Sequence, residues 1–589
     1  MKTLKTTLWK YVCVTACCMC SLYGLAQPSA LPPFTPPPPV PPAAPEGSVP
    51  MGDPEAFPEV KLDFPMEPGP FEPTWESIHA HYADYPAWLR EAKFGCWVHF
   101  GPQAAGMSGD WYAKRMYEEG EKAYINHIRD FGHPATEGHG YKDILRTWNP
   151  EKYDPERLVE IYRDAGARFL FIQGVHHDNF DLWDSKYQPW NSVRMGPRRD
   201  LLAEWSKAVR RAGMHYGVTF HHEYTWWWWE SAFRSDREGP YAGMTYDGAL
   251  TQADPAGQWW EDVDLRMLYG PNFRGYAGIG TERWAPVKGI FTQHADYARW
   301  YATNWALRIL DAIERYDPDF IYTDGNSTQP FSGYLSGTGY KCDAAQRLIA
   351  SYYNRALRLR GKTDVFSIVK FHPAGRRGIV TTFENQYPDG IKTDQAWIGE
   401  NPVGDWYYAP GFTYSAAAVI RFLLECVSRD GCYAVSIPIR PDGSLEPECE
   451  QMLKETGNWM KINGDGIYGS KAWKKPGEGK DGKLRLLPHG AVGKKMADFT
   501  FGPEDFRFTE GKDGNVYAYC LSVPDRETGL SIVSLGRRAG LLDSAVASVE
   551  LLGYGGKIAW KQDDDALHIT CPDVSDTLNT AVCFRIRTK

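Results

Sequence analysis

The chain has 589 residues, which is enough for two domains and a large hydrophobic core. Its formal net charge is −9, and no basic patch typical of nucleic-acid binding stands out, so no nucleic-acid partner is predicted. Aromatic residues make up 14% of the chain. Aromatic walls suit the apolar faces of sugars, but a large core also uses such residues, so composition supports sugar binding only weakly.

The first 26 residues have the pattern of a secretory signal peptide. Three lysines precede an apolar run over residues 11–26, which is too short for a membrane span. Gly24-Leu25-Ala26 provides a cleavage site between small residues. We therefore predict export to the periplasm or the extracellular space and no transmembrane span in the mature protein. Val14-Thr15-Ala16-Cys17 is similar to a bacterial lipoprotein box, so anchoring through a lipid at Cys17 is the alternative.

Prolines dominate the next segment, with an unbroken run from Pro36 to Pro39. Proline-rich segments adopt an extended, polyproline-like backbone and do not form a core of their own. The composition therefore predicts that residues 27–72 form a linker.

From about residue 73, short apolar runs alternate with amphipathic stretches. Strands are predicted at 94–100, 169–173, 216–220, 320–323, 366–369 and 379–383, and helices at 155–166, 201–212, 294–316 and 342–360. This alternation predicts a parallel sheet with crossover helices, and its length favours a (β/α)8-like TIM barrel over residues 73–469. No GxGxxG motif follows a strand, which argues against a dinucleotide-binding fold.

The last part of the chain, residues 470–589, has a different pattern of apolar and polar residues. Short alternating runs separated by turn residues occur at 516–521, 531–535, 557–560 and 566–570. They predict an antiparallel β-sandwich domain. The expected fold class is thus α/β, a barrel followed by a sandwich.

Eight cysteines follow the leader, and none of them forms a CxxC pair or a zinc-type Cys/His spacing. Cys426/Cys432 and Cys571/Cys583 are the pairs that an oxidising compartment would allow to bridge, but free buried thiols are the expected state.

Polar residues follow five of the predicted strands. They are His99, His176-His177-Asp178, His221-His222-Glu223, Asp324-Gly325 and Glu384-Asn385. In a parallel barrel the carboxyl ends of the strands meet at one mouth, so these groups are expected to converge there. Adjacent histidines on a strand point to different sides, no HxH lies on or directly after a predicted strand, and no HExxH occurs, so no metal ligand is predicted.

Two of these groups are carboxylates at strand ends. Glycoside hydrolysis requires one ionised carboxylate at the anomeric carbon and one protonated carboxyl at the leaving oxygen, roles that Asp324 and Glu384 would fit. With 74 acidic residues in the chain, their placement by chance remains an alternative.

Several blocks together resemble family 29 of the glycoside hydrolases, the retaining α-L-fucosidases, over about residues 75–475. They are Trp88 to Gly101, Gly109-Asp110-Trp111-Tyr112, His176-His177-Asp178 through Ser185, Gly196-Pro197, Tyr322-Thr323-Asp324-Gly325, Val427 to Gly431, Pro441-Asp442-Gly443, and Asn463-Gly464. The resemblance implies a barrel followed by a β-domain. It also implies that the chain is a divergent, bacterial-type member of this family. It also implies hydrolysis of a fucosylated glycan without a cofactor.

The resemblance also assigns roles. Asp324 would be the nucleophile, and Glu384 the acid/base with Glu400 in reserve. His99, His176 and His177 would bind fucose hydroxyls, and the aromatic of the "DWY" block is Trp111. A deoxy methyl group needs an apolar wall, for which Trp111, Tyr322 and Phe383 are candidates.

The chain departs from the family pattern in places. An arginine that commonly contacts the sugar has no clean counterpart, since Lys370, Arg376 and Arg377 all lie near the position. The predicted function is an exo-acting retaining α-L-fucosidase. The alternatives are a secreted carbohydrate-binding protein on a degenerate hydrolase barrel, or a retaining exo-hydrolase for a related sugar such as α-galactose.

Overall fold

The computed structural model describes most of the chain from residue 31 onward. The described residues are 31–39, 58–223, 225–252, 255–271, 295–325, 340–373, 377–480, 483–490, 498–525, 529–574 and 580–589. The predicted signal peptide, residues 1–26, and the alternative lipid site at Cys17 lie outside them. Within these ranges no helix combines the length and apolar character that crossing a membrane requires.

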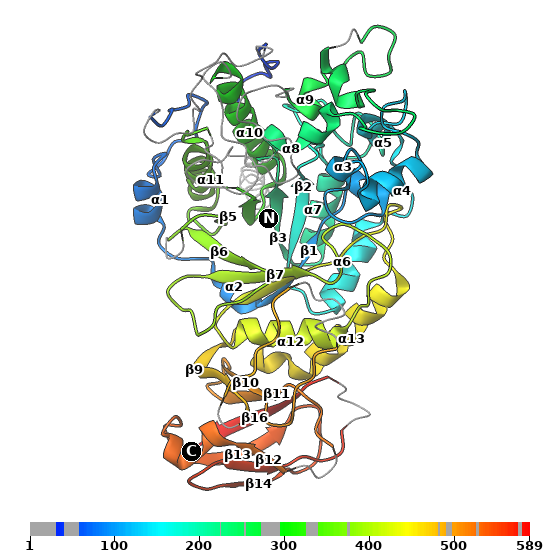
Figure 1. Ribbon diagram of the computed structural model, residues 1–589. Coiled ribbons are helices and arrows are strands. Elements are labelled where there is room, and N and C mark those ends of the chain that lie inside the picture. The colour runs from blue at the N-terminus through cyan, green and yellow to red at the C-terminus, as the bar shows by residue number, and fades with distance from the viewer. Residues whose placement is uncertain are drawn as a thin grey trace, which may run out of the picture.

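Eight parallel strands form a closed barrel in chain order, β1-β2-β3-β4-β5-β6-β7-β8 (Figure 1). They are β1 Phe94–Val98, β2 Phe169–Val175, β3 His215–Phe220, β4 Phe320–Thr323, β5 Phe366–Val369, β6 Ile379–Glu384, β7 Trp397–Pro402 and β8 Cys432–Ser436. β1 pairs with β8, which closes the sheet. The predicted (β/α) barrel is confirmed.

The helices surround this barrel. They are α1 Trp75–His81, α2 Ala87–Ala92, α3 Tyr112–Arg115, α4 Lys122–Asp130, α5 Tyr141–Thr147, α6 Pro155–Asp164, α7 Leu201–Arg211, α8 Thr225–Trp228, α9 Arg266–Tyr269, α10 Ala295–Tyr316, α11 Ala344–Arg360, α12 Ala416–Val427 and α13 Pro447–Asn463. Capping explains several starts: Asp154, Asp200 and Ser415 each accept a hydrogen bond from a backbone N–H of the first turn.

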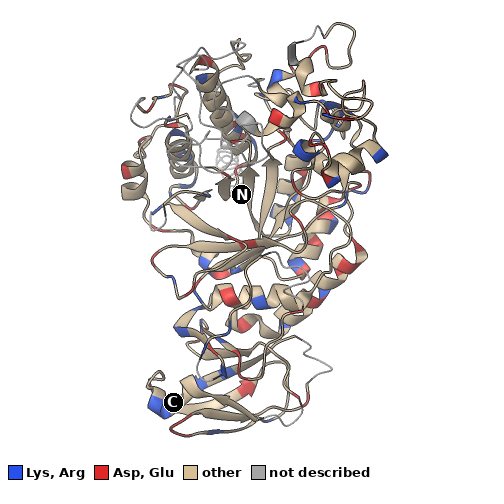
Figure 2. Ribbon diagram, viewed as in Figure 1, with Lys and Arg blue, Asp and Glu red and all other residues tan. Residues whose placement is uncertain are grey.

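The barrel interior is packed with aromatic rings that require small neighbours. A Cβ on Gly217 of β3 would lie 2.1 Å from the Phe320 ring, and one on Gly95 of β1 would lie 2.4 Å from the Phe169 ring. Glycine at these positions therefore gives each ring its space inside the barrel. Charged residues lie mainly on the helices and loops (Figure 2). In the eight strands the only charged residues are Glu384 and Glu400.

The C-terminal part forms two antiparallel sheets, which confirms the predicted β-sandwich class. One has the order β13-β16-β11-β10-β9 and the other β12-β15-β14. The strands are β9 Lys471–Glu478, β10 Phe506–Glu510, β11 Val516–Cys520, β12 Gly529–Ile532, β13 Val546–Leu551, β14 Ala559–Gln562, β15 Leu567–Thr570 and β16 Val582–Thr588. Their apolar faces share a second core, which includes Phe508, Ile532 and Ile569.

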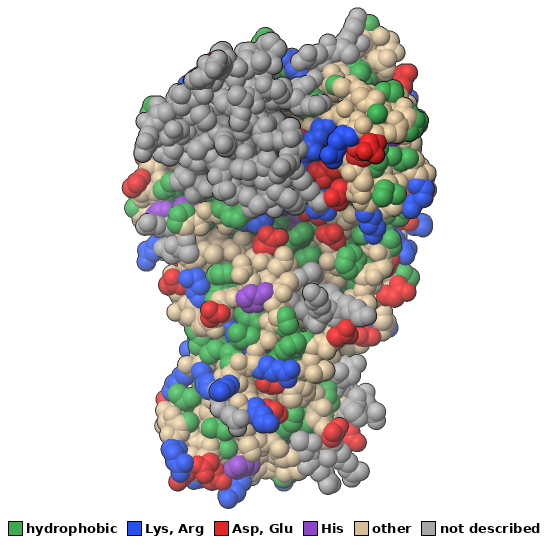
Figure 3. Space-filling view, viewed as in Figure 1, with side chains coloured by type: hydrophobic (Ala, Val, Ile, Leu, Met, Phe, Trp, Pro, Cys, Tyr) green, Lys and Arg blue, Asp and Glu red, His purple; other side chains and the backbone are tan. Residues whose placement is uncertain are grey.

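The sheets join the barrel through α12 and α13, which lie between the two parts (Figure 1). In the space-filling view this lower part is narrower than the barrel above it (Figure 3). Glu425 of α12 accepts hydrogen bonds from Arg507 of β10 at 2.8 and 2.5 Å, and from Arg429 at 2.6 Å. All three side chains are fully buried. This ionic cluster links barrel and sandwich.

The described parts of the predicted linker lie against the barrel instead of extending freely. Carbonyls of Leu31, Pro32 and Thr35 accept hydrogen bonds from Lys186, Tyr187 and Trp300, respectively. Further along, Leu62, Phe64 and Phe71 are buried in the barrel's core cluster. The carbonyls of a polyproline backbone have no hydrogen-bond partner within their own segment. Donor side chains on the barrel can therefore bind them. Sequence composition alone does not indicate these partners.

All eight cysteines after the leader are free and buried. The expectation of free thiols is therefore confirmed for this part of the chain, and neither of the two candidate bridges is formed.

Candidate active site

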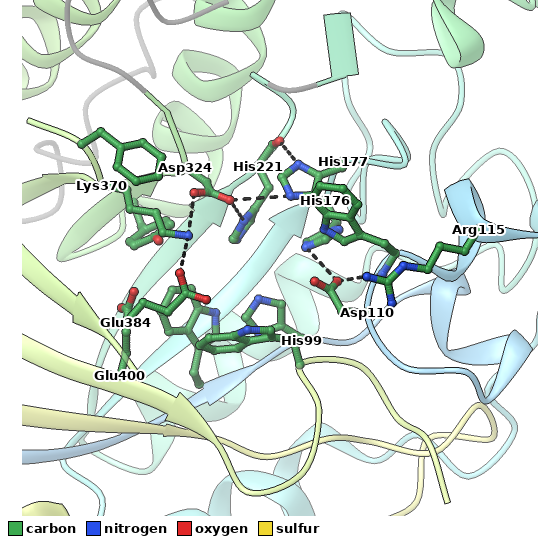
Figure 4. A pocket seen from close by; sticks show the side chains of 15 residues that line it. His99, Asp110, Arg115, His176, His177, His221, Asp324, Lys370, Glu384 and Glu400 are labelled. Atoms are coloured by element: carbon green, nitrogen blue, oxygen red, sulfur yellow. Dashed lines mark hydrogen bonds and ion pairs between the residues drawn. The ribbon is translucent and has the colours of Figure 1, made fainter. Parts of the chain in front are cut away.

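One pocket, with a volume of about 220 Å³, opens at the carboxyl ends of the barrel strands (Figure 4). It is lined by eight side chains that the sequence places in the site: His99, Trp111, His176, His177, Tyr322, Asp324, Glu384 and Glu400. The other seven lining residues are Trp97, Asp110, Arg115, His221, Lys370, Phe371 and Trp406. The barrel thus brings together residues that are up to 309 positions apart in the chain, from Trp97 to Trp406.

Asp324 follows β4 and is almost completely buried, with 4% of its surface exposed. Oδ1 lies 3.0 Å from the Lys370 ammonium, and Oδ2 accepts a hydrogen bond from His221 Nδ1 at 3.1 Å. Burial alone would raise the pKa of Asp324, but Lys370 and His221 outweigh it and hold that pKa well below its ordinary value. The carboxylate is therefore ionised at neutral pH.

Gly325 next to Asp324 is required by space. A Cβ at this position would lie 1.1 Å from Oε2 of Glu223, a buried side chain behind the tip of β4. Glycine after a strand often permits a tight turn, but the close approach of Glu223 is the stronger reason for glycine at this position. Burial and the nearby Asp324 raise the pKa of Glu223 well above its ordinary value, which favours the uncharged acid beside Asp324.

We expect Gly325→Ala to lower kcat/KM by roughly 100-fold. The new methyl group would clash with Glu223, so either the Glu223 side chain or the segment that contains Asp324 must move. The matched control is Gly390→Ala, where a Cβ would meet nothing within 4 Å. Steady-state kinetics and melting temperatures of both variants test this. Unchanged kcat/KM in Gly325→Ala would contradict the close approach.

Glu384 at the end of β6 faces Asp324 across the pocket. Its Oε2 lies 2.9 Å from the same Lys370 ammonium that lies 3.0 Å from Asp324 Oδ1. The two carboxylate oxygens are therefore at most about 6 Å apart, close to the ~5–5.5 Å of retaining glycosidases and below the ~6.5–9.5 Å of inverting ones. One third of the Glu384 side chain is exposed, so solvent reaches it.

Glu400 on β7 is the register partner of Glu384 on β6. It is buried, with 1% of its surface exposed, and no described residue hydrogen-bonds its Oε2. Burial raises the pKa of Glu400 well above its ordinary value, which favours the neutral acid. Of the two glutamates, Glu384 is the one in contact with Lys370 and open to solvent.

The paired histidines present different hydrogen-bonding groups to the pocket. The amide N–H of Gln103 donates to His176 Nδ1 at 2.7 Å, so the proton of His176 is on Nε2, which lies 3.7 Å from Asp110. His177 Nδ1 donates to the His221 carbonyl at 2.7 Å, which leaves its Nε2 as an acceptor. Adjacent histidines therefore offer one donor and one acceptor to a ligand.

These imidazoles are neutral. Burial lowers the pKa values of His99 and His176 well below their ordinary value, and with the neighbouring His221 it lowers that of His177 to about 3. His221 donates to Asp324, and its Nε2 has no hydrogen-bond partner among the described residues. The neutral imidazoles of His99, His176 and His177, beside the open Nε2 of His221, suit a ligand with several hydroxyl groups.

Other sequence-based candidates lie elsewhere. Asp178 accepts a hydrogen bond from Tyr141 at 2.6 Å and does not line the pocket, so it supports the loop after β2 and not a histidine ring. Phe383 packs on Trp397 and is also absent from the lining. Arg377 is exposed, and Arg376 lies outside the described residues. Lys370 is the basic residue that reaches the pocket.

The sequence assigned no definite role to the other seven lining residues, of which five are instructive. His221 belongs to a noted strand-end cluster without a role, and Lys370 is one of three open candidates. Asp110 and Arg115 lie in and after the "DWY" block, whose tryptophan alone was assigned. Trp406 follows β7, a strand that the sequence pattern did not reveal. The strand-end position was a usable signal for His221 and Lys370.

Two groups of side chains have the spacing of metal ligands: His99 with His176 and His221, and His177 with His221 and Asp324. The Lys370 ammonium already lies 3.0 Å from Asp324, so a cation in the second group would be repelled at close range. The prediction that the site uses no metal stays a prediction.

Comparison with known proteins agrees with this geometry. The Alpha-L-fucosidase family pattern matches residues 61–465, and the Alpha-L-fucosidase C-terminal domain pattern matches residues 502–587. The chain is 24% identical over 518 residues to tissue alpha-L-fucosidase of Rattus norvegicus, covering 86% of this chain and 90% of that protein. It is 22% identical over 501 residues to plasma alpha-L-fucosidase of Homo sapiens, covering 83% and 86%.

Solved structures show the same fold. The Thermotoga maritima alpha-fucosidase structure in complex with a mechanism-based inhibitor superposes with a TM-score of 0.61 at 20% identity, covering 88% of this chain and 100% of that one. A trapped covalent intermediate of a Bacteroides thetaiotaomicron GH29 alpha-L-fucosidase gives a TM-score of 0.54 at 16% identity, covering 85% and 95%. Because the family pattern covers more than half of the chain, this protein belongs to the alpha-L-fucosidase family.

Proposed function

We propose that the protein is an exo-acting retaining α-L-fucosidase that releases terminal fucose from a fucosylated glycan. The observation that carries this is the pair of carboxylates, Asp324 and Glu384, held by one lysine within the retaining distance. The small volume of the pocket at the barrel mouth suits a single terminal sugar instead of the middle of a chain.

The hydrolysis proceeds in two displacements. Asp324 attacks the anomeric carbon as the bond to the leaving oxygen breaks, and Glu384 gives that oxygen its proton. Glu384 then takes a proton from water, whose oxygen attacks the same carbon and releases Asp324 as a carboxylate. Two inversions give net retention, and all the groups required belong to this chain.

The remaining lining residues hold the sugar. His176 donates and His177 accepts, so the pair fits hydroxyl groups that both accept and donate. Trp111 and Tyr322 offer apolar surface to the deoxy methyl group. The His99 ring, which lies tilted with its centroid 4.8 Å from that of the Trp406 ring, completes this wall from the side of β1.

A panel of aryl glycosides tests the substrate. We expect release from the α-L-fucoside, with the α-anomer of fucose as first product by NMR, and much slower release from the α-galactoside. Release from α-galactoside alone would favour the related exo-hydrolase. Saturable binding of fucose without any release would favour a carbohydrate-binding protein, and a first product of β configuration would contradict retention.

We expect Glu384→Gln to lower kcat by roughly 10²–10⁴-fold on a substrate with a poorly acidic leaving group, because the leaving oxygen no longer receives a proton. An acidic nitrophenol needs little protonation, so its release should fall less, and azide should accelerate it by replacing base-activated water. Glu400→Gln is the matched control. Its activity relative to wild type should depend neither on the acidity of the leaving group nor on added azide. The reverse pattern would make Glu400 the acid/base.

Several features beyond the family assignment complete the proposal. The chain is a divergent, bacterial-type family member that is exported by cleavage after residue 26 and has a segment to residue 72 preceding the barrel. The barrel covers residues 73–469 and the sandwich residues 470–589. The basic, apolar and small residues of the leader support export. The intact mass of the exported chain tests it: a chain beginning at residue 27 is expected, and a lipid-modified Cys17 would establish the alternative.

A further inference from the structure

We propose that Lys370 is a catalytic residue that changes its ion-pair partner during the reaction. In the free enzyme it balances the charge of Asp324, and in the glycosyl-enzyme it stabilises the carboxylate of Glu384 that activates water. This inference rests on the proposed function and deepens it.

The placement of Lys370 is built into the barrel. Its backbone N–H donates to the Thr323 carbonyl at 3.1 Å, and the N–H of Phe371 donates to the Gly325 carbonyl at 3.2 Å. The segment after β5 is therefore fixed to the chain on both sides of Asp324. From this anchor the ammonium reaches Asp324 Oδ1 at 3.0 Å and Glu384 Oε2 at 2.9 Å (Figure 4).

The charges around Lys370 make it the balancing group. Asp324 and Tyr322 face it from β4 and its end, Glu384 from β6 and Glu400 from β7, and the groups facing from the ends of the other strands are His99, His176, His177 and His221. The cations that line the described pocket are Lys370 and Arg115, and Lys370 forms ion pairs with both reacting carboxylates. A charge pair this close, with 18% of the lysine exposed, is weakly screened.

The first displacement removes the negative charge of Asp324, because its oxygen becomes part of an ester with the anomeric carbon. The ammonium then attracts Glu384 alone, which favours the ionised form just when Glu384 must accept a proton from water. When water has attacked and the ester bond has broken, Asp324 regains its charge. The ammonium is shared again, and Glu384 can keep the proton needed for the next cycle.

Lys370→Met tests this with a nitrophenyl α-L-fucoside. We expect the second displacement to slow by about 100-fold, so that nitrophenol appears in a burst equivalent to the enzyme concentration before a slow steady state. Azide is already an anion and needs no base, so it should restore turnover and give fucosyl azide. The acidic limb of kcat/KM should move to higher pH, because Asp324 without its cation holds a proton more readily.

Lys370→Arg keeps the charge and should show a smaller burst and a smaller shift of the acidic limb. Arg115→Met removes the other lining cation and should produce neither the burst nor the azide effect. Lys370→Gln replaces Lys370→Met if the latter does not give the wild-type melting profile. A uniform loss of activity, with no burst, azide effect or shifted limb, would overturn the role of Lys370. Failure of the wild type to release nitrophenol would instead refute the proposed function.

Discussion

Asp324→Asn is expected to lower kcat by roughly 10⁴-fold, equivalent to about 5.4 kcal/mol of transition-state stabilisation. The amide has nearly the shape of the carboxylate but is too weak a nucleophile to form the glycosyl-enzyme. Melting temperature should change little, because the amide still fills the site between His221 and Lys370. Initial rates on an aryl α-L-fucoside measure the loss.

The matched control for this variant is Asp178→Asn. Asp178 is as buried as Asp324 and also follows a barrel strand, but it bonds to Tyr141 and does not line the pocket. We expect its kcat to fall by less than about 10-fold. Comparable losses in the two variants would mean that Asp324 has only a structural role, and intact turnover in Asp324→Asn would refute the mechanism.

Glu425→Gln should give the largest loss of stability, about 3–5 kcal/mol in the free energy of unfolding. The substitution leaves Arg429 and Arg507 fully buried without a negative partner. Because the cluster joins α12 to β10, we expect the sandwich to separate from the barrel before the barrel unfolds. Urea titrations followed by tryptophan fluorescence and by limited proteolysis measure both events.

A surface pair provides the control. Arg157 and Glu450 form an exposed pair at 2.8 Å, so Glu450→Gln should lower the free energy of unfolding by at most about 1 kcal/mol.

The stabilisation by Glu425 also depends on pH. Burial alone would raise the pKa of Glu425, but Arg507 and Arg429 outweigh it and hold that pKa below its ordinary value.

The sign of this dependence is fixed by the lowered folded-state pKa. The stabilisation is fully present above the unfolded-state value of about 4.3, and it disappears as the pH falls through the folded-state pKa. The difference between wild type and Glu425→Gln should therefore shrink on acidification. A difference that stays constant from pH 7 down to pH 3 would contradict the charge-based origin.

Local pattern was enough to predict the barrel and most of its mouth. Strands such as β2 and β4 are continuous apolar runs followed by polar residues, and a parallel barrel puts such ends together. Asp324 and His176 were found in this way. β7 was not found, because Glu400, Asn401 and Pro402 interrupt its apolar pattern, although the buried strand tolerates them at the mouth.

Contacts between residues that are far apart in the chain could not be predicted from the sequence. Nothing local indicates that Lys370 lies between Asp324 and Glu384, or that Glu223 comes close enough to exclude any side chain at position 325. The docking of Leu31 and its neighbours on the barrel also depends on partners far along the chain. These features arise from the closure of the barrel, which sequence periodicity does not specify in detail.

The most direct measurement is to trap the glycosyl-enzyme with 2-deoxy-2-fluoro-α-L-fucosyl fluoride, followed by peptide mass spectrometry. The fluorine slows both displacements, and the fluoride leaves readily enough for the first to proceed, so the ester should accumulate. One 2-fluorofucosyl group on Asp324 is the expected result. A label on any other residue, or unlabelled protein that still releases fucose from an aryl fucoside, would contradict the account.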